Sequence, residues 1–161
     1  MYLADPGSDP AIKMHTICKS SPEIAGILQP VIDGKRCLHD IVTGEILQLE
    51  ADIFDFEIVN SHNIIKSGKY LLYEESYDWA TKRAEEALAS EFRLFIIDGI
   101  SSTELKGSGM ITAIHKVLWT ASVRQSKKFL FVVRPKHLNE FSRLFLGTID
   151  YKIVNCITEI E

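Results

Sequence analysis

The sequence is poor in cysteine and lacks any closely spaced cysteine pair. Its three cysteines, Cys18, Cys37 and Cys156, are odd in number and far apart in the chain. This pattern argues against a disulfide framework and against a zinc site, because both depend on paired or clustered thiols. We therefore expect reduced thiols that are partly buried.

Long hydrophobic runs and concentrated positive charge are also absent. No stretch reaches the roughly 18 consecutive apolar residues that a membrane-spanning helix requires, and the N-terminal MYLADPGSDP has neither the basic nor the apolar part of a secretory leader. The net charge is −4, from 18 basic and 22 acidic residues, with no polybasic patch. We expect a cytoplasmic protein whose partners include neither nucleic acid nor a membrane.

What is present indicates one α/β domain spanning residues 1–161. The composition, 46% hydrophobic and 25% charged, is typical of a soluble globular domain. From residue 77 onward, apolar runs of strand length alternate with helical periodicity, which predicts a mostly parallel sheet flanked by helices. The predicted order is helix 77–89, strand 92–98, helix from 110, strand 127–133, helix after Pro135 and strand 151–157.

The front half predicts β structure instead, in the form of an antiparallel β-hairpin insertion. Residues 23–32 favour a strand that bends or lies at an edge, because it contains Gly26 and Pro30. Residues 35–42 and 45–49 alternate in polarity around turn signals, as an antiparallel meander does. The remaining predicted elements are strands at 1–3 and 69–73 and a helix at 11–19.

Three helices have a predicted cap or an apolar stripe at helical spacing. Ser76 is the expected cap of the first, and Ser108 or Gly109 that of the second. The expected stripes are Tyr77, Ala80, Ala84, Ala87 and Leu88; then Met110, Ile111, Ile114, Val117, Leu118 and Ala121; then Leu138, Phe141, Leu144 and Phe145.

The strongest candidate for function is Asp98, which ends the apolar run of residues 92–98. Ligands of open parallel sheets bind outside the carboxyl ends of the strands, so an acid there is a candidate for catalysis or for a metal. Glu104, in the loop that follows, is the second catalytic candidate. The candidates for binding a cofactor are Ser101, Ser102, Lys106, Gly107 and Gly109. The alternative, favoured for the loop residues, is a turn-capping acid followed by a solvated loop.

Other chemistry has little support in the sequence. The five histidines are scattered without metal-ligand spacing, and no Gly-x-Ser-x-Gly motif marks a serine nucleophile. The glycines at 107 and 109 could expose backbone N–H groups to an anion, but a simple turn is the favoured reading.

Several phrases, in their order and spacing, resemble the small bacterial and archaeal nucleoside-triphosphatases of the P-loop class. The phrases are Ile24-Ala-Gly-Ile27, Asp33-Gly-Lys-Arg36, Asp40-Ile-Val-Thr-Gly-Glu45, Gly68-Lys-Tyr70, Tyr77-Asp-Trp-Ala80, Phe95-Ile-Ile-Asp98 and Glu104-Leu-Lys-Gly-Ser-Gly109. The resemblance covers residues 24–134. It implies a P-loop-type α/β fold, Asp98 in the Walker B position, and a nucleoside triphosphate with magnesium as ligand.

Two chemical elements of that family are missing from this chain. A Walker A loop needs Gly-x-x-x-x-Gly-Lys-[Ser/Thr] to cradle phosphates and hold magnesium, whereas the matching turn carries Asp9, Pro10 and Ala11. The family has a glutamate after the Walker B aspartate, whereas Gly99 follows Asp98 here. Loss of such a base costs about 10²–10⁴ in rate.

The leading hypothesis is therefore a degenerate, non-catalytic relative without a cofactor, which acts as a binding or regulatory module through a protein partner or as a homo-oligomer. The alternative is an active phosphohydrolase or nucleotide binder that uses the Asp98 loop. A third possibility is that a P-loop precedes Met1. Trp79 or Trp119 could mark an interface, although both could equally be core residues.

Overall fold

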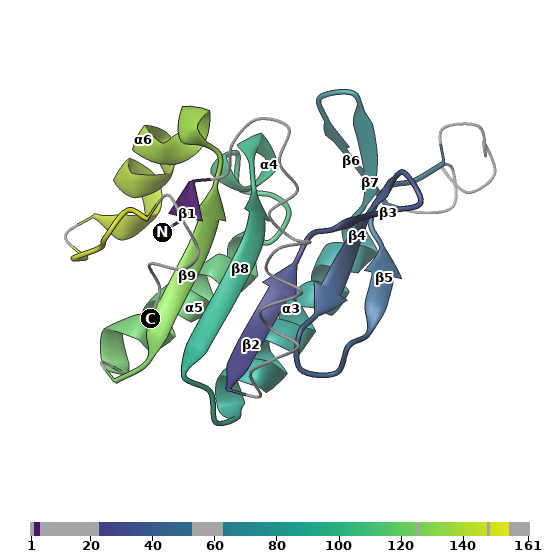
Figure 1. Ribbon diagram of the computed structural model, residues 1–161. Helices are drawn as coiled ribbons and strands as arrows, with labels where there is room; N and C mark the ends of the chain where they lie inside the picture. Colours follow the sequence, from purple (N-terminus) through teal and green to yellow (C-terminus); the bar gives the residue numbers. More distant parts are fainter. Residues whose placement is uncertain (1, 4–22, 53–62, 125, 148, 155–161) are drawn as a thin grey trace.

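A computed structural model describes residues 2–3, 23–52, 63–124, 126–147 and 149–154. In this part of the chain seven strands form one mixed sheet, of which the parallel half is the centre of the molecule (Figure 1). The predicted helix at 11–19, the turn carrying Asp9 to Ala11, and part of the predicted final strand lie outside the described residues.

The sheet joins a parallel half to an antiparallel half at β2. Six strands follow in the order β1 (Tyr2–Leu3), β9 (Lys128–Val133), β8 (Leu94–Ile100), β2 (Ile24–Leu28), β4 (Lys35–Asp40) and β3 (Val31–Ile32), and β5 (Ile46–Gln48) also pairs with β4. The pairs from β1 to β2 are parallel and those of β4 are antiparallel. This confirms the predicted α/β fold, with antiparallel strands in the first half; the sheet as a whole is mixed.

The central strands are buried on both faces, which explains their continuous apolar sequences. Along β8 the side chains of Phe95 and Ile97 belong to one apolar cluster, whereas Ile96 between them belongs to another. Successive side chains of a strand point to opposite faces of the sheet, which explains why neighbours along β8 belong to different clusters. The run at 92–98 is therefore a true central strand, shifted by two residues relative to the prediction.

Gly26 allows β2 and β8 to lie side by side. It pairs with Ile96 in the parallel register, has a φ of 129°, and a Cβ on it would overlap the backbone of Ile96. The predicted strand at 23–32 is interrupted, since β2 ends at Leu28, before Pro30. It does not lie at an edge of the sheet, because Gly26 lets the backbones of β2 and β8 approach closely and does not interrupt their pairing.

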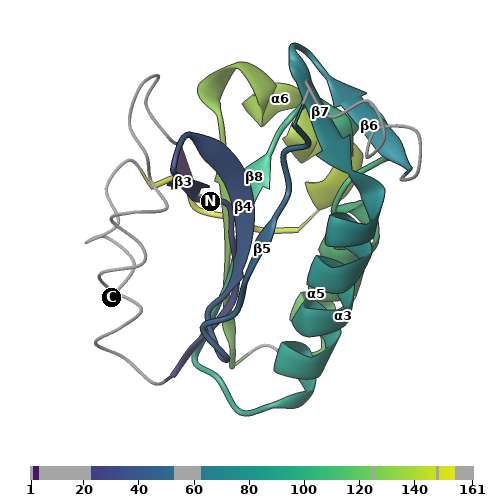
Figure 2. The same cartoon turned by 90° about the vertical axis from the view of Figure 1, so that its right-hand side faces the viewer.

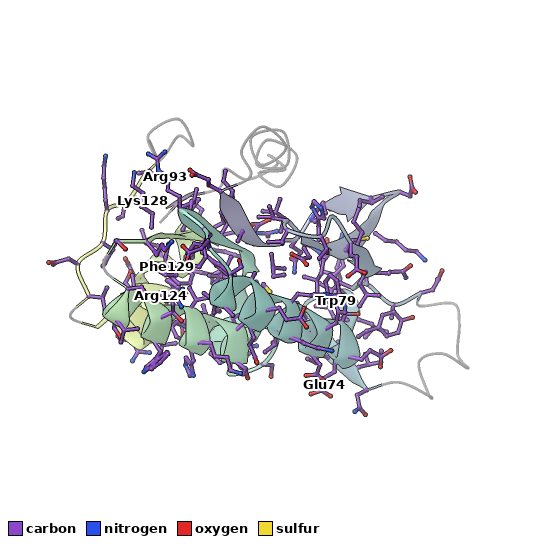
Figure 3. The ribbon with its side chains drawn as sticks, turned by 90° about the horizontal axis from the view of Figure 1, so that it is seen from below. Glu74, Trp79, Arg93, Arg124, Lys128 and Phe129 are labelled. Atoms are coloured by element: carbon purple, nitrogen blue, oxygen red, sulfur yellow. The ribbon has the colours of Figure 1, made fainter. Side chains whose placement is uncertain are left out.

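Two helices, α3 (Glu74–Ala89) and α5 (Ile111–Val123), cover one face of the sheet (Figure 2). They run side by side, with Trp79 on α3 and Arg124 at the end of α5 (Figure 3). Arg124 Nη1 donates to the Leu88 carbonyl at 3.1 Å, which ties the ends of the two helices together. All five predicted stripe residues of α3 are buried, as are Met110, Ile114 and Val117 of the α5 stripe.

Both predicted caps are wrong. The N-cap of α3 is Tyr73, and that of α5 is Met110. Ser76 lies inside α3, where its buried hydroxyl donates to the Gln48 carbonyl at 2.7 Å. A tertiary hydrogen bond thus takes the hydroxyl that sequence alone assigns to the helix terminus.

The C-terminal part departs further from the prediction. After β9 the chain forms a short 3-10 turn (Pro135–His137), α6 (Leu138–Phe141) and a π-helical turn (Ser142–Leu146). Phe141 is buried as predicted, but Leu144 is 43% exposed and Leu146 is buried in its place. The wider π turn changes which residue faces the core. Residues 151–153 are exposed and form no strand, so that part of the predicted final strand is wrong.

A two-stranded hairpin stands beside the main sheet. It joins β6 (Ile64–Ser67) and β7 (Tyr70–Tyr73) in antiparallel register. The strand β7 was predicted and its partner β6 was not. Among the described residues, no helix has the length and apolar character to cross a membrane.

Candidate functional site

Asp98 lies at the carboxyl end of β8 and is buried, with 4% of its surface exposed. Its Oδ2 accepts the backbone N–H of Gln29 at 3.1 Å, and its Oδ1 accepts that of Gly99 at 2.7 Å. The pairing of β8 with β9 shifts register between Ile97 and Ile100. The carboxylate thus lies beside Gln29, the residue that follows β2.

The position after Asp98 is closed to a side chain. Gly99 has a φ of 92°, and a Cβ built on it would lie 2.7 Å from Cδ and 2.9 Å from Cβ of Gln29. The Gln29 side chain therefore fills the space that any side chain at position 99 would enter. Position 99 requires glycine for two reasons, backbone conformation and lack of room.

Glu104 forms hydrogen bonds with other residues of the segment that follows β8. Its fully buried carboxylate accepts the Ser101 backbone N–H at 2.8 Å, the Ser101 hydroxyl at 2.9 Å and the Met110 N–H at 3.4 Å. Burial raises the pKa of this carboxyl, and the hydrogen bonds from Ser101 and Met110 oppose the rise. A Cβ at Gly109 would overlap Glu104 Oε1, so glycine there makes room for the acid.

The segment from Gly99 to Gly109 was predicted as a loop, but it contains a short helix, α4 (Ser102–Leu105). Ser101 is its N-cap, and with Glu104 it forms a capping box. The sequence does carry this signal, since Ser101-Ser-Thr-Glu104 has the Ser-x-x-Glu spacing of the motif. Glu104, predicted to lie in a solvated loop, is therefore an integral part of the local fold.

The candidate residues after Asp98 fall into two groups. Ser101, Glu104 and Gly109 come together around the buried carboxylate. Ser102 begins α4 and is half-buried, whereas Lys106 and Gly107 are exposed. In the described ranges, no three His, Cys, Asp or Glu side chains gather as a metal ligand set.

Three residues that the sequence analysis did not name as site candidates connect Asp98 to the hairpin. Gln29 Oε1 accepts Arg36 Nη1 at 3.4 Å, and the Arg36 guanidinium carbon lies 4.4 Å from the centroid of the Tyr70 ring. A chain of contacts thus runs from Asp98 through Gln29 and Arg36 to Tyr70. These residues lie up to 69 positions apart in sequence, so no local pattern predicts their meeting.

The hairpin is also joined to α4. Ser67 Oγ and Thr103 Oγ1 are 2.7 Å apart, and Ser67 pairs with Tyr70 across the hairpin. Directly opposed residues of an antiparallel pair point to the same side. One side of the hairpin therefore contacts both α4 and Arg36.

Of the two tryptophans considered as interface markers, Trp119 on α5 is 70% exposed. Trp79 on α3 is half-buried and packs against the main core. Only Trp119 is thus displayed to solvent.

The comparisons with known proteins support the fold by similarity of structure and not by similarity of sequence. No family model matches the chain, and no curated protein matches it in sequence. Among solved structures, the chain is similar to THEP1 from the hyperthermophile Aquifex aeolicus, with a TM-score of 0.66 and 12% identity over 99% of this chain and 91% of that one. The chain has a P-loop NTPase-like α/β fold.

Proposed function

We propose that this chain is a degenerate relative of the small P-loop nucleoside-triphosphatases, a non-catalytic cytoplasmic protein that acts as a binding or regulatory module. The observation that carries the proposal is the contact between Gly99 and Gln29. In the family that the sequence resembles, a glutamate follows the aspartate and helps to activate water. Here the corresponding space contains a neutral amide side chain.

The surroundings of Asp98 support the same conclusion. Each of its oxygens already accepts a backbone N–H, from Gln29 and from Gly99. Glu104 is the next acid along the chain, but its carboxylate is fully buried and accepts N–H and O–H groups of its own segment. Both acids that the sequence named as catalytic candidates thus accept hydrogen bonds from their own surroundings, which supports a site that does not hydrolyse a magnesium-bound nucleotide.

Titration calorimetry with ATP and with GTP, each with magnesium, tests this proposal. We expect no micromolar binding. Magnesium-dependent micromolar binding that Asp98→Asn abolishes would contradict the proposal and would favour the alternative, a nucleotide binder that uses the Asp98 segment.

A further inference from the structure

The Arg36 guanidinium on β4 has few partners among the described residues. No carboxylate of the described residues forms an ion pair with its guanidinium. Its Nε is buried without a hydrogen-bond partner, and Nη1 reaches only the neutral amide oxygen of Gln29 at 3.4 Å. A guanidinium has five N–H donors, and the Nε–H donor of this one is left without an acceptor.

A second unpaired cation lies at the same aromatic ring. Lys69 Nζ is 5.2 Å from the centroid of the Tyr70 ring, against 4.4 Å for the Arg36 guanidinium carbon. No ion pair involves Lys69 among the described residues. Its neighbour Lys35 differs, because it pairs with Asp52 at 3.0 Å.

The two cations act on the Tyr70 hydroxyl. Hydrogen bonding from Arg36, and then the positive charges of Arg36 and Lys69, lower the pKa of this phenol. Two positive groups therefore converge on the same phenol oxygen. The Glu50 carboxylate lies nearby, but its Oε2 accepts the Arg36 backbone N–H at 3.3 Å and forms no ion pair with either cation.

We propose that Arg36, Lys69 and Tyr70 form a binding site for a phosphate group. A guanidinium and an ammonium supply the two positive charges that complement a phosphate dianion, and the phenol supplies an additional donor. Tyr70 holds the guanidinium by stacking, and Gln29 orients it from the side of Asp98. The site uses neither Asp98 nor residues 101–109, so it stands whether or not the proposed function is right.

The test is a titration of the full chain with inorganic phosphate, in which the NMR signal of the Arg36 Nε–H group is monitored. This proton belongs to the guanidinium in question and reports on a change in its charge environment. We expect a saturable shift at millimolar phosphate and no comparable shift with chloride at the same ionic strength. A parallel titration with acetate tests whether the site prefers a carboxylate. We expect acetate to bind more weakly than phosphate, because it carries a single negative charge. A phosphate monoester, glycerol phosphate, shows whether a phosphate attached to a larger molecule is also accepted.

Three variants test whether Arg36, Lys69 and Tyr70 bind the phosphate. Lys69→Gln and Tyr70→Phe, both changes near the surface, should each weaken phosphate binding, Lys69→Gln by about tenfold. Arg36→Gln should abolish binding, read from the backbone signals of the hairpin. The matched control is Lys66→Gln, an exposed lysine of the same hairpin whose cross-strand partner is Leu71, on the opposite side from Tyr70.

Three results would overturn the proposal. The first is the absence of a phosphate-specific shift at Arg36. The second is an equal loss of binding in Lys66→Gln and Lys69→Gln, since this would indicate general attraction to surface charge. The third is stronger binding of acetate than of phosphate, because the site would then recognise a carboxylate.

Discussion

Gly99→Ala should destabilise the protein by more than Gly107→Ala. Both glycines have positive φ, 92° and 83°, but a Cβ at Gly107 meets nothing within 4 Å, whereas one at Gly99 meets Gln29 at 2.7 Å. Both variants carry the strain of an unfavourable backbone conformation, about 1–3 kcal/mol. Only Gly99→Ala adds overpacking, which costs about 1–3 kcal/mol more.

Urea unfolding measures this difference directly. With a slope of about 2 kcal/mol per molar, an extra cost of about 2 kcal/mol lowers the unfolding midpoint of Gly99→Ala by about 1 M relative to Gly107→Ala. In a Gln29→Gly background the extra cost should largely disappear, because the atoms that the new methyl group meets are gone. Coupling between the two positions is the quantity that a double-mutant cycle isolates.

Equal midpoints for Gly99→Ala and Gly107→Ala would refute the reasoning. So would an unchanged cost of Gly99→Ala in the Gln29→Gly background. Either result would mean that Gln29 does not occupy the space beside Gly99, and the proposed loss of catalysis would lose its structural support.

Three further predictions concern the sheet and the segment after it. Gly26→Ala should cost more than about 3 kcal/mol in urea unfolding, because its Cβ would overlap the rigid backbone of Ile96. Burial raises the pKa of Glu104 above its ordinary 4.5, so the folded state keeps this proton to a higher pH than the unfolded chain. Stability relative to Glu104→Gln should therefore fall as pH rises from 4.5 through the raised pKa, and urea unfolding at several pH values checks the sign. Ser67→Ala and Thr103→Val should show a coupling of about 1 kcal/mol in a double-mutant cycle, and additive effects would mean that their 2.7 Å contact contributes nothing.

The elements that the sequence predicted well are those that bury one regular apolar face. The stripe of α3 and the apolar run of β8 are encoded by spacing alone, and both are buried as expected. Elements controlled by tertiary contacts were missed. Ser76 was assigned to a helix cap because nothing local shows that its hydroxyl donates to Gln48, and β6 has too short and polar a sequence to indicate a strand.

The candidate site divides in the same way. Asp98 was predicted to end a central strand, because a carboxylate after an apolar run is a local signal, and it lies near the carboxyl end of that strand, which continues to Ile100. The meeting of Gln29, Arg36 and Tyr70 depends on three separate segments and leaves no such trace in the sequence. The sequence shows that glycine occupies position 99, where the resembling family has a glutamate. Only the structure shows that the Gln29 side chain fills the space beside that glycine.

Single-turnover phosphate release, with the protein in excess over GTP and magnesium, tests the central claim most directly. Comparison of the unmodified chain with Asp98→Asn distinguishes turnover at this carboxylate from background hydrolysis. We expect the two rates to be equal within error, because Gly99 follows Asp98 where the proposal requires an acid to activate water. A rate above the uncatalysed background that falls in Asp98→Asn would contradict the account.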